Sequence, residues 1–316
     1  MKTVLITGGA GFLGSHLCDY FMNKDYNVIC MDNLVTGREE NISHLMKKNR
    51  FRFLNHDVSK RIDSDNLNGD IDYILHFASP ASPVDFDKMP VEIAMTNSVG
   101  TLNMLDLARK KNAVMMFAST SECYGDPEVN PQPETYNGNV NTTGIRSCYD
   151  ESKRFAESLI MAYHRAYGVD VRIARIFNTY GPRMRRMDGR AVPAFINQAL
   201  HDEPITVFGE GKQTRSFCFV DDEIEGFYRL LMSDEKYPVN IGNPHEISIL
   251  DFAKKIIDVT SSSSEIVFKP LPEHDPKVRR PDITKAKEKL DWEPKIGIDE
   301  GLKRTIEYFK GVNGIK

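Results

Sequence analysis

Short apolar runs alternate with amphipathic stretches through the first half of the chain. Six runs rich in Val, Ile, Met or Phe are predicted to be strands: residues 3–7, 27–31, 51–54, 73–77, 114–118 and 171–176. Residues 15–23 and 96–111 have helical periodicity, the latter with Leu102, Leu105 and Ala108 on one side. Strands separated by helices predict βαβ units and a parallel sheet that is covered on both faces. The fold class is therefore α/β, with a Rossmann-like, doubly wound parallel sheet.

The hydrophobic pattern becomes less regular after Asn178. Pro, Gly and Arg are frequent over 181–211, and later helices are predicted at 250–259, 284–290 and 298–309. We expect a nucleotide-binding domain over residues 1–177, with later returns at roughly 225–262, and a mainly substrate-binding domain over 178–316. The second domain is the smaller one, is discontinuous in sequence, and completes a cleft with the first.

Composition places the chain among globular proteins rather than disordered or membrane proteins. Its 316 residues are 41% hydrophobic and 27% charged, the usual balance of a globular domain. The net charge of −4 argues against a nucleic-acid partner, because phosphate backbones select strongly basic surfaces. The chain begins without a signal-like stretch, and no apolar run approaches the roughly 20 residues that span a bilayer. We expect a cytoplasmic protein with no membrane partner.

Cysteine and histidine patterns give no indication of a metal site. The five cysteines are scattered and form no CxxC pair: Cys18, Cys30, Cys123, Cys148 and Cys218. Such spacing is poor material for a disulfide framework or a zinc site and fits a reducing cytosol. His164, His201 and His245 are isolated, and no cluster has metal-ligand spacing.

A glycine-rich turn follows the first predicted strand and opens a helix. It runs ITGGAGFLG and places glycine at Gly8, Gly11 and Gly14, with Phe12 and Leu13 at the helix start. Glycines let the backbone turn tightly and approach a pyrophosphate, and the helix N-terminus attracts its charge. The turn predicts a dinucleotide site, although a purely structural turn is the alternative.

An acidic residue at the end of the second strand strengthens that prediction. Asp32, followed by Asn33, can accept hydrogen bonds from the ribose hydroxyls of an adenosine. A carboxylate there repels the extra phosphate of NADP, so NAD is the predicted cofactor and residues 1–177 its domain. Arg38 lies close enough in sequence to keep NADP as an alternative. Three further residues at strand ends are expected to border the cofactor: Asp57, Val58 and Ala78. In the alternative interpretation, Asp57 and Val58 are ordinary turn residues.

Tyr149 and Lys153 form a YxxxK pair whose members lie on one face of a helix. An ammonium beside a phenol favours the phenolate, which makes the tyrosine a usable general base, and the lysine can also bind a ribose. The pair follows a strand that ends at Thr120, whose hydroxyl would reach the same cleft. Two unrelated helix residues are the alternative for YxxxK alone.

Eight segments together resemble extended short-chain dehydrogenases that act on nucleotide sugars, the NAD-dependent epimerase/dehydratase family. They are TGGAGFLGSH, ASTSECYGDPEVNPQ, CYDESKRFAES, RIFNTYGPRM, DGRAVPAFI, GKQTRSFCFVDD, NIGNP and RRPDITKAKEKLDWEP. The resemblance extends from Met1 to about Phe309. Within that group, HFASPASP and STSECYGDPEV are most similar to the UDP-glucuronate decarboxylases, also called UDP-xylose synthases.

The resemblance implies catalytic roles for Thr120, Glu122, Tyr149 and Lys153. These enzymes oxidise C4 of the sugar with NAD; a C5 carboxylate then leaves as CO2, and C4 is reduced again. Related 4,6-dehydratases have an aspartic acid that protonates the departing hydroxyl where this chain has Ser121. A serine is too weak an acid for that step, but it can donate a hydrogen bond to a carboxylate. Glu122 is expected to position the sugar or to manage protons.

A UDP-hexose 4-epimerase, or another epimerase or dehydratase of nucleotide sugars, remains the alternative. It needs only Thr120, Tyr149 and Lys153 together with space for the keto-sugar to rotate. A non-catalytic protein on the same fold would be expected to lack one of these three residues, and none is missing. Family members usually pair through the helix after Asn97 and the helix bearing Tyr149, so a homodimer is implied.

Cations in the second half are expected to bind the nucleotide-sugar substrate. Arg215 resembles a family arginine that lies near the diphosphate and the sugar carboxylate, which a guanidinium can engage with two hydrogen bonds. Five further substrate contacts are predicted, with a solvated loop or a core strand as the alternative for some of them: Asn178, Arg183, Val207, Phe208 and Arg280. Residues 80–90 and 125–147 are expected to lie over the sugar and to exclude water.

Overall fold

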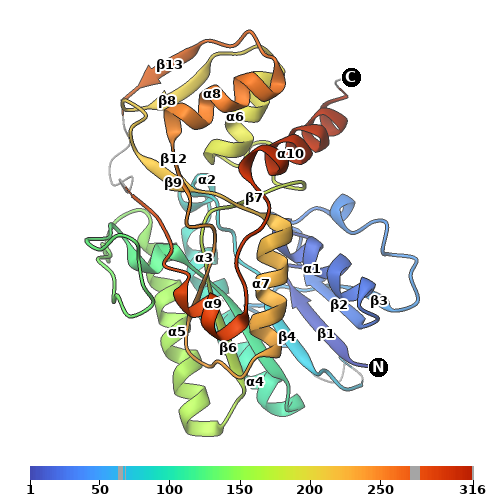
Figure 1. Cartoon of the computed structure of the whole chain (residues 1–316). Helices are drawn as coiled ribbons and strands as arrows, with labels where there is room; N and C mark the ends of the chain where they lie inside the picture. Colours follow the sequence, from blue (N-terminus) through green and yellow to red (C-terminus); the bar gives the residue numbers. More distant parts are fainter. Residues whose placement is uncertain (63–66, 68, 271–277, 315–316) are drawn as a thin grey trace.

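A seven-stranded parallel sheet forms the centre of the molecule in the computed structural model, which describes residues 1–62, 67, 69–270 and 278–314. The strand order is β11-β6-β5-β4-β1-β2-β3, so the strand sequence reverses between β1 and β4 (Figure 1). This arrangement confirms the predicted Rossmann-like, doubly wound sheet. The strands have these bounds: β1 Thr3–Thr7, β2 Asn27–Asp32, β3 Phe51–Asn55, β4 Tyr73–His76, β5 Val114–Thr120, β6 Val171–Ile176 and β11 Val239–Ile241.

Helices cover both faces of the sheet, as its apolar strands require. In β1, Val4 and Ile6 belong to a core cluster that contains Phe21 of α1 and Phe227 of α7. Leu5 belongs to a second cluster on the other face, with side chains of α4 and α5. Alternate side chains of one strand thus enter two cores. These helices have the following bounds: α1 Phe12–Asn23, α4 Thr101–Lys111, α5 Ser147–Tyr167 and α7 Val220–Met232.

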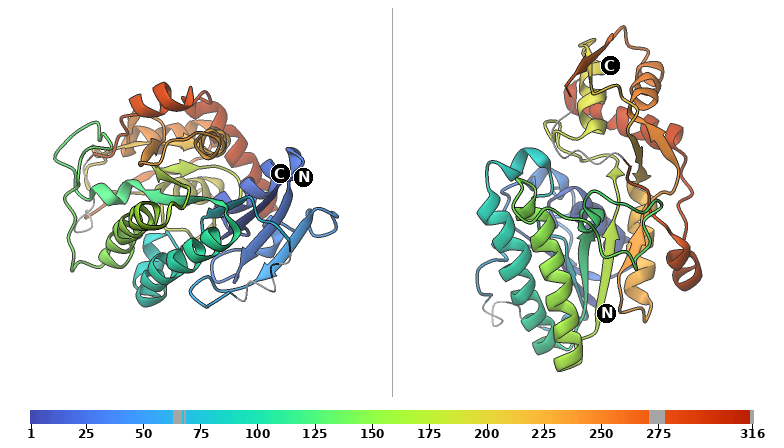
Figure 2. Two further views of the ribbon diagram at one scale, coloured as in Figure 1. Left: turned by 90° about the horizontal axis from the view of Figure 1, so that it is seen from below. Right: turned by 90° about the vertical axis from the view of Figure 1, so that its left-hand side faces the viewer.

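A second group of elements packs beyond the carboxyl ends of the sheet (Figures 1 and 2). Helices α6 and α8 pack against each other and against the parallel pair of β8 and β13, and α10 packs on both helices. Short pairs β7–β10 and β9–β12 connect this group to the sheet. The bounds are α6 Ala191–Leu200, α8 Ile249–Thr260, α10 Ile298–Asn313, β7 Thr179–Tyr180, β8 Ile205–Phe208, β9 Thr214–Ser216, β10 Cys218–Phe219, β12 Glu246–Ser248 and β13 Ile266–Lys269.

The chain passes between the two groups several times. Helix α7 packs on α1 and β6, and β11 joins the sheet, so residues 220–241 lie with the first group. Helix α8 instead packs on α6, β8 and α10. The expected return at roughly 225–262 therefore contains a helix whose contacts belong to the second group. Helix α9, Thr284–Leu290, packs on α7 and β11. The division into two domains stays a prediction.

Shorter elements complete the connections of the nucleotide-binding half. The helix expected over 96–111 starts earlier, with α3 at Pro90–Met95, and a π-helical turn at Thr96–Gly100 leads into α4. The first helix begins at Phe12, three residues before its expected start. Further single turns are α2 at Pro83–Phe86 and the 3-10 helices Glu39–Asn41 and Ser121–Tyr124. None of the helices in the described ranges is both long and apolar enough to cross a bilayer.

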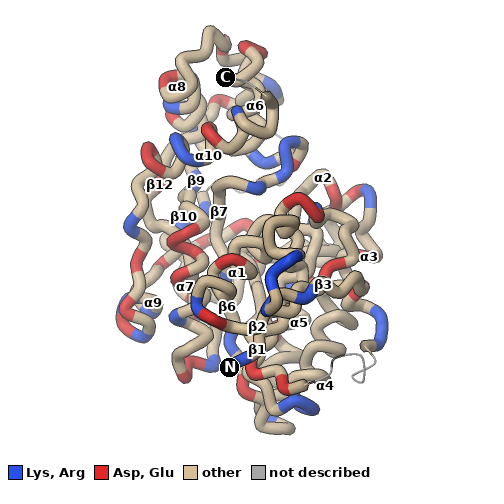
Figure 3. The backbone as a smooth tube through the Cα atoms, turned by 90° about the vertical axis from the view of Figure 1, so that its right-hand side faces the viewer, with Lys and Arg blue, Asp and Glu red and all other residues tan. Residues whose placement is uncertain are grey.

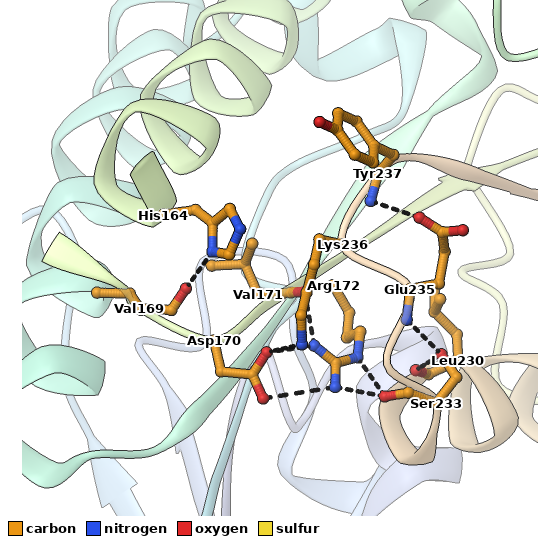
Figure 4. Close-up of polar contacts among 10 residues, drawn as sticks. All are labelled: His164, Val169, Asp170, Val171, Arg172, Leu230, Ser233, Glu235, Lys236 and Tyr237. Carbon is orange, nitrogen blue, oxygen red and sulfur yellow. Dashed lines mark hydrogen bonds and ion pairs between the residues drawn. The ribbon is translucent and has the colours of Figure 1, made fainter. Parts of the chain in front are cut away.

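A polar cluster closes the edge of the sheet where β6 begins (Figure 4). The Asp170 carboxylate lies beside the Arg172 guanidinium, 2.6 Å away, and beside the Lys236 ammonium. Arg172 also donates to the carbonyl of Ser233 at 2.8 Å, just after α7. Burial raises the pKa of Asp170, but hydrogen bonds from the two cations outweigh burial and hold that pKa below its ordinary value. The cluster thus ties the connection after α7 to the start of β6.

Candidate active site

A cavity of about 1100 Å³ lies where the sheet meets the second group of elements. Its lining includes the carboxyl ends of β1, β2, β4, β5 and β6 on one side and residues of α6, β8 and β9 on the other. Ligands of open parallel sheets bind at this edge, where strand order reverses. The predicted dinucleotide and sugar residues therefore share one cavity, apart from two exceptions described below.

The glycine-rich turn forms one end of this cavity. Gly8 has a φ of 69°, and a Cβ there would lie 2.8 Å from the backbone of Ala78 at the end of β4. A Cβ on Gly14 would lie 2.0 Å from the carbonyl oxygen of Gly8. Larger residues at either position would displace the backbone. The turn leaves the N-terminus of α1 open toward the cavity, where Gly11, Phe12 and Leu13 also line it, a setting that suits a pyrophosphate.

Asp32 is oriented by the backbone around it. Its Oδ2 accepts a hydrogen bond from the Ala10 amide at 3.0 Å, and its Oδ1 accepts one from the Leu34 amide at 2.8 Å. Burial raises the pKa of Asp32, and these amide bonds oppose that effect. Arg38 donates to Asn41 and to Tyr308 of α10. Four other predicted cofactor residues line the same end: Asn33, Asp57, Val58 and Ala78.

The dinucleotide prediction fits this end of the cavity. The Asp32 carboxylate lies at the end of the second strand, and the glycines of the turn let its backbone pack tightly beside the open N-terminus of α1. Asp57 Oδ1 also accepts a hydrogen bond from the amide of Ser59 at 2.9 Å, so this side chain stabilises the local turn as well. The residues present can hold an NAD molecule across the sheet edge.

Tyr149 and Lys153 lie together near the first turn of α5, close to the end of β5. The Lys153 ammonium donates to the Ala118 carbonyl at 2.7 Å and lies 5.7 Å from the centre of the Tyr149 ring. Burial lowers the pKa of Lys153 to about 7. Burial also raises the pKa of Tyr149 well above its ordinary value, opposed by a hydrogen bond with Thr120.

The expectation that Lys153 lowers the pKa of Tyr149 is therefore not met in the protein alone. Burial disfavours the Tyr149 phenolate more than the neighbouring Lys153 favours it, because Lys153 is itself buried and easily deprotonated. The charges of Glu122, Asp150 and Cys123 raise the pKa of Tyr149 further. Tyr149 also interacts electrostatically with the guanidinium of Arg190.

Glu122 is held between two arginines just beyond β5. Arg146 binds one oxygen of its carboxylate and Arg279 the other. Burial raises the pKa of Glu122, but the two guanidinium groups outweigh burial and lower that pKa to about 2. The carboxylate is therefore ionised at neutral pH and cannot act as a proton donor there. This group of three residues, here called the Glu122 cluster, has a net charge of +1.

Sequence reasoning missed the two arginines of the Glu122 cluster. Arg279 is adjacent to Arg280, which was predicted instead, and only the fold shows which of the two points inward. Arg146 lies three residues before Tyr149, a spacing that places both on one helix face. Its Nε also lies 3.7 Å from the Asp150 carboxylate. That helical spacing was the one signal that could have identified Arg146.

Two predicted substrate residues lie outside the cavity lining. Val207 is fully buried in the core, whereas Phe208 is 43% exposed and lines the cavity. Successive residues of β8 face opposite sides, so the two could not both face the ligand. Arg280 does not line the cavity, and its guanidinium lies 3.7 Å from Glu246. Phe208 and Arg279 occupy the inward-facing positions.

The other predicted substrate residues do line the cavity: Ser121, Asn178, Arg183 and Arg215. The Asn178 side-chain nitrogen is buried without a hydrogen-bond partner within the described part of the chain. Arg183 lies 2.6 Å from Asp19 at the rim. Arg215 of β9 donates to the Thr214 carbonyl at 2.8 Å. Their roles toward a substrate stay predictions.

Charged residues of both signs are spread over the molecule. Acidic and basic stretches are interspersed along the backbone (Figure 3). Within residues 1–62, 67, 69–270 and 278–314, no three His, Cys, Asp or Glu side chains gather in a group that could hold a metal ion. His164, one of the isolated histidines, instead contacts the Val169 carbonyl with its Nδ1 at 2.9 Å (Figure 4).

Comparison with known proteins decides the family. The family profile described as GDP-mannose 4,6 dehydratase matches residues 5–305. The chain belongs to this family of NAD-dependent epimerases and dehydratases. It is 52% identical to UDP-glucuronic acid decarboxylase 4 of Arabidopsis thaliana over 97% of this chain and 68% of that protein. It is 50% identical to UDP-glucuronic acid decarboxylase 1 of Danio rerio over 98% and 72%. The resemblance inferred from the motifs is confirmed, and its relatives are enzymes.

Solved structures share the whole fold. UDP-glucose 4-epimerase of Thermotoga maritima, determined with UDP-glucose, has a TM-score of 0.90 at 31% identity and covers 99% of this chain and 100% of its own. UDP-glucuronic acid 4-epimerase of Bacillus cereus, in complex with UDP-glucuronic acid and NAD, has a TM-score of 0.89 at 30% identity and covers 98% and 100%.

Proposed function

We propose that this enzyme converts UDP-glucuronate to UDP-xylose and CO2 with NAD as a catalytic cofactor. The observation that carries the proposal is about 50% identity, over nearly the whole chain, to curated UDP-glucuronic acid decarboxylases of plants and vertebrates. The cavity adds support because the same lining contains the glycine-rich turn, Tyr149 and the net-positive Glu122 cluster.

A bound NAD would supply a reversible hydride acceptor for C4 of the sugar. Asp32 binds the adenosine ribose, and the glycine turn receives the pyrophosphate. Tyr149 takes the proton from the 4-hydroxyl and later returns it, with Thr120 bonded to the same phenol. Lys153 would hold the nicotinamide ribose, and its ammonium, when protonated, lies 5.7 Å from the Tyr149 ring, where it favours the phenolate.

Loss of CO2 follows from the position of the ketone. Oxidation at C4 converts the sugar to a β-keto acid, so the electrons left by the departing carboxylate pass into the C4 carbonyl as an enolate. Ser121 donates a hydrogen bond to the carboxylate, while the Glu122 cluster places two guanidinium groups in the same wall. The oxyanion develops at the C4 oxygen beside Tyr149 and Thr120, and fixed donors at that point stabilise it without reorganising. C5 then takes up a proton, which restores the C4 ketone before C4 is reduced again. Asn178, Arg183 and Arg215 bind the diphosphate and sugar.

Epimerisation at C4 is the second candidate, favoured by the near-complete structural match to two UDP-sugar 4-epimerases. Incubation with UDP-glucuronate separates the candidates by product mass. A decarboxylase yields a nucleotide sugar lighter by one CO2, whereas an epimerase yields an isomer of unchanged mass. We expect the lighter product and no net rise at 340 nm, because the hydride returns to C4. An isomer of equal mass as the main product would overturn the proposal.

We further propose that the enzyme is a cytoplasmic homodimer. Four apolar side chains are exposed on the neighbouring helices α3, α4 and α5: Val91, Met95, Leu102 and Phe155. Val91 and Met95 also line the cavity, so Leu102 and Phe155 support the pairing most directly. Exposed apolar groups on neighbouring helices favour pairing with a second copy. Light scattering after gel filtration should give twice the mass of one chain, and Phe155→Glu should give a single chain. A monomeric wild type would contradict the proposal.

A further inference from the structure

A short segment between β4 and α3 contacts the catalytic helix with an aromatic side chain. Phe86 in α2 stacks on the ring of Tyr149, with ring centres 5.4 Å apart and planes 20° from parallel. The guanidinium of Arg146 lies 5.5 Å from the centre of the same phenyl ring. Phe86 is buried and forms a small apolar cluster with Tyr149 and Ile93. One side chain therefore contacts both the proposed base and an arginine of the Glu122 cluster.

The same segment is attached to the second half of the molecule. The carboxylate of Asp85 lies 2.5 Å from the guanidinium of Arg185, and the hydroxyl of Ser82 donates to the carbonyl of Asp188. Arg185 and Asp188 lie in the connection between β7 and α6. Gly189 permits this approach: a Cβ there would lie 2.4 Å from a methyl group of Val84. Residues 82–86 thus bridge the two halves across the cavity.

We propose that Phe86 and the Asp85–Arg185 pair are positioning residues that align Tyr149 and Arg146 when the two halves are joined. The four residues of α2 are too few for a helix that is stable by itself, so contacts at both ends determine their conformation. Asp85 is 3% exposed, and removing Arg185 takes away its ion-pair partner and leaves this buried carboxylate with only the electrostatic influence of Arg190. The Asp85–Arg185 contact is therefore expected to form or break as a unit, and the position of the Phe86 ring depends on it.

A double-mutant cycle tests the attachment. Asp85→Asn and Arg185→Gln should each lower kcat about tenfold, with KM for UDP-glucuronate and NAD affinity changed less than about twofold. The double variant should be no worse than either single variant, because both remove one interaction. Additive losses, or an unchanged kcat accompanied only by a lower melting temperature, would overturn the proposal.

Substitution of the aromatic ring tests the contact with Tyr149. Phe86→Leu keeps apolar volume but loses the stack and should lower kcat, whereas Phe86→Tyr keeps the stack and should retain most of it. Phe252→Leu is a matched control, because Phe252 stacks on Phe217 at 4.5 Å within the second half. It should lower the melting temperature without lowering kcat. Equal kcat in Phe86→Leu and wild type would contradict the role of the ring.

The kinetic tests rest on the proposed function. The activity of the wild type distinguishes a wrong function from a wrong positioning role. If the wild type does not convert UDP-glucuronate, the function is wrong. If it does, and all these variants keep its kcat, the positioning role is wrong. Amide hydrogen exchange in the protein alone tests the attachment without any substrate. Exchange at 83–89 and 147–150 should be faster in Asp85→Asn than in wild type, and equal exchange would overturn the attachment.

Discussion

Two carboxylates, Glu122 and Asp170, each lie between two cations, but at opposite edges of the same sheet. Glu122 follows β5 at the carboxyl edge and lines the cavity, with 16% of its side chain exposed. Asp170 precedes β6 at the amino edge, with 41% exposed (Figure 4). In both cases the cations outweigh burial and lower the carboxyl pKa.

The partners differ in origin. Arg172 is two residues from Asp170, and Lys236 enters through the neighbouring connection after α7. Arg146 and Arg279 are 24 and 157 residues from Glu122, and they reach it from α5 and from the second half. Lys236 is itself 66 residues from Asp170, so the two groups differ in position rather than in sequence distance. Asp170 and its cations lie outside the cavity lining, whereas Glu122, Arg146 and Arg279 all line the cavity, where perturbed charged groups indicate a site for a ligand. Glu122 and Asp170 therefore have similar charged partners but different positions relative to the cavity.

Replacing Glu122 by Gln should have the largest effect. The two arginines would lose the anion that orients them, and the cavity wall would gain a full positive charge. We expect kcat/KM for UDP-glucuronate to fall on the order of 100-fold or more, which corresponds to about 3 kcal/mol of transition-state stabilisation. Steady-state assays of UDP-xylose formation measure this. A loss below tenfold would show that the Glu122 cluster is not part of the reaction.

Replacing Arg279 by Lys should have a smaller but clear effect. The guanidinium binds Glu122 and also donates to the Gly125 carbonyl at 3.2 Å, and one ammonium cannot reproduce both contacts. We expect kcat to fall about 10- to 50-fold with little change in NAD binding. Arg172→Lys at the other edge is the control, and it should cost about 1–2 kcal/mol of unfolding free energy with normal kcat. Equal kinetic losses in both variants would remove the distinction.

Lys153 allows a pH test of the cavity edge. Its folded pKa of about 7 is below the unfolded 10.5, so between these values the unfolded chain binds more protons than the folded one. Stability of the cofactor-free protein should therefore gain from Lys153 as pH rises from 7 to 10.5. Lys153→Met should be most stabilised relative to wild type below pH 7, by a few kcal/mol at most, and this advantage should shrink toward pH 10.5.

Thermal melts across that pH range measure the difference. Lys236→Met is the matched control at the amino edge, since that lysine lies beside Asp170 rather than in the cavity. It should keep the pH slope of the wild type. A Lys153→Met slope identical to the wild-type slope would show that the buried ammonium carries no such penalty.

Replacing Asp170 by Asn should have the smallest effect. Arg172 keeps its bonds to the carbonyls of Ser233 and Val171, and the lost ion pair is partly exposed. We expect a loss of about 0.5–1 kcal/mol in unfolding free energy, less in high salt, with kcat within twofold of wild type. Chemical denaturation at two salt concentrations measures this. The stabilisation is present above pH 3.8 and is lost as pH falls below it, because the folded pKa is lowered.

Patterns along the chain were sufficient to predict the fold and the meeting of Thr120, Tyr149 and Lys153 in one cavity. The bounds of β1, β6 and α9 agree with the predicted ranges, because buried strands and amphipathic helices have distinct hydrophobic periods. Tyr149 and Lys153 lie on one helix, as their spacing of four residues predicts, and β5 delivers Thr120 beside them. Local spacing and strand ends supplied this information.

Residues that depend on long-range packing could not be predicted. Arg279 rather than Arg280 lines the cavity, and of the predicted pair Val207 and Phe208 only Phe208 does, because the direction of each side chain is set by a backbone whose position depends on the whole fold. Likewise, the pKa of Tyr149 rises despite the adjacent Lys153, since burial is a property of the folded pocket rather than of the helix. The pairing of Asp85 with Arg185 joins segments 100 residues apart.

Strand β11 joins the sheet only after the chain has formed α6, β8 and β9 of the second group of elements. Because β11 and α7 follow β10, and α9 returns once more before α10, exchanging the second group of elements between relatives would require junctions near residues 178, 220, 245, 280 and 297. A chimera made with one junction would leave the edge of β6 without its neighbour. New sugar specificities in this scaffold are therefore more accessible through individual side chains of the cavity wall than through the exchange of modules.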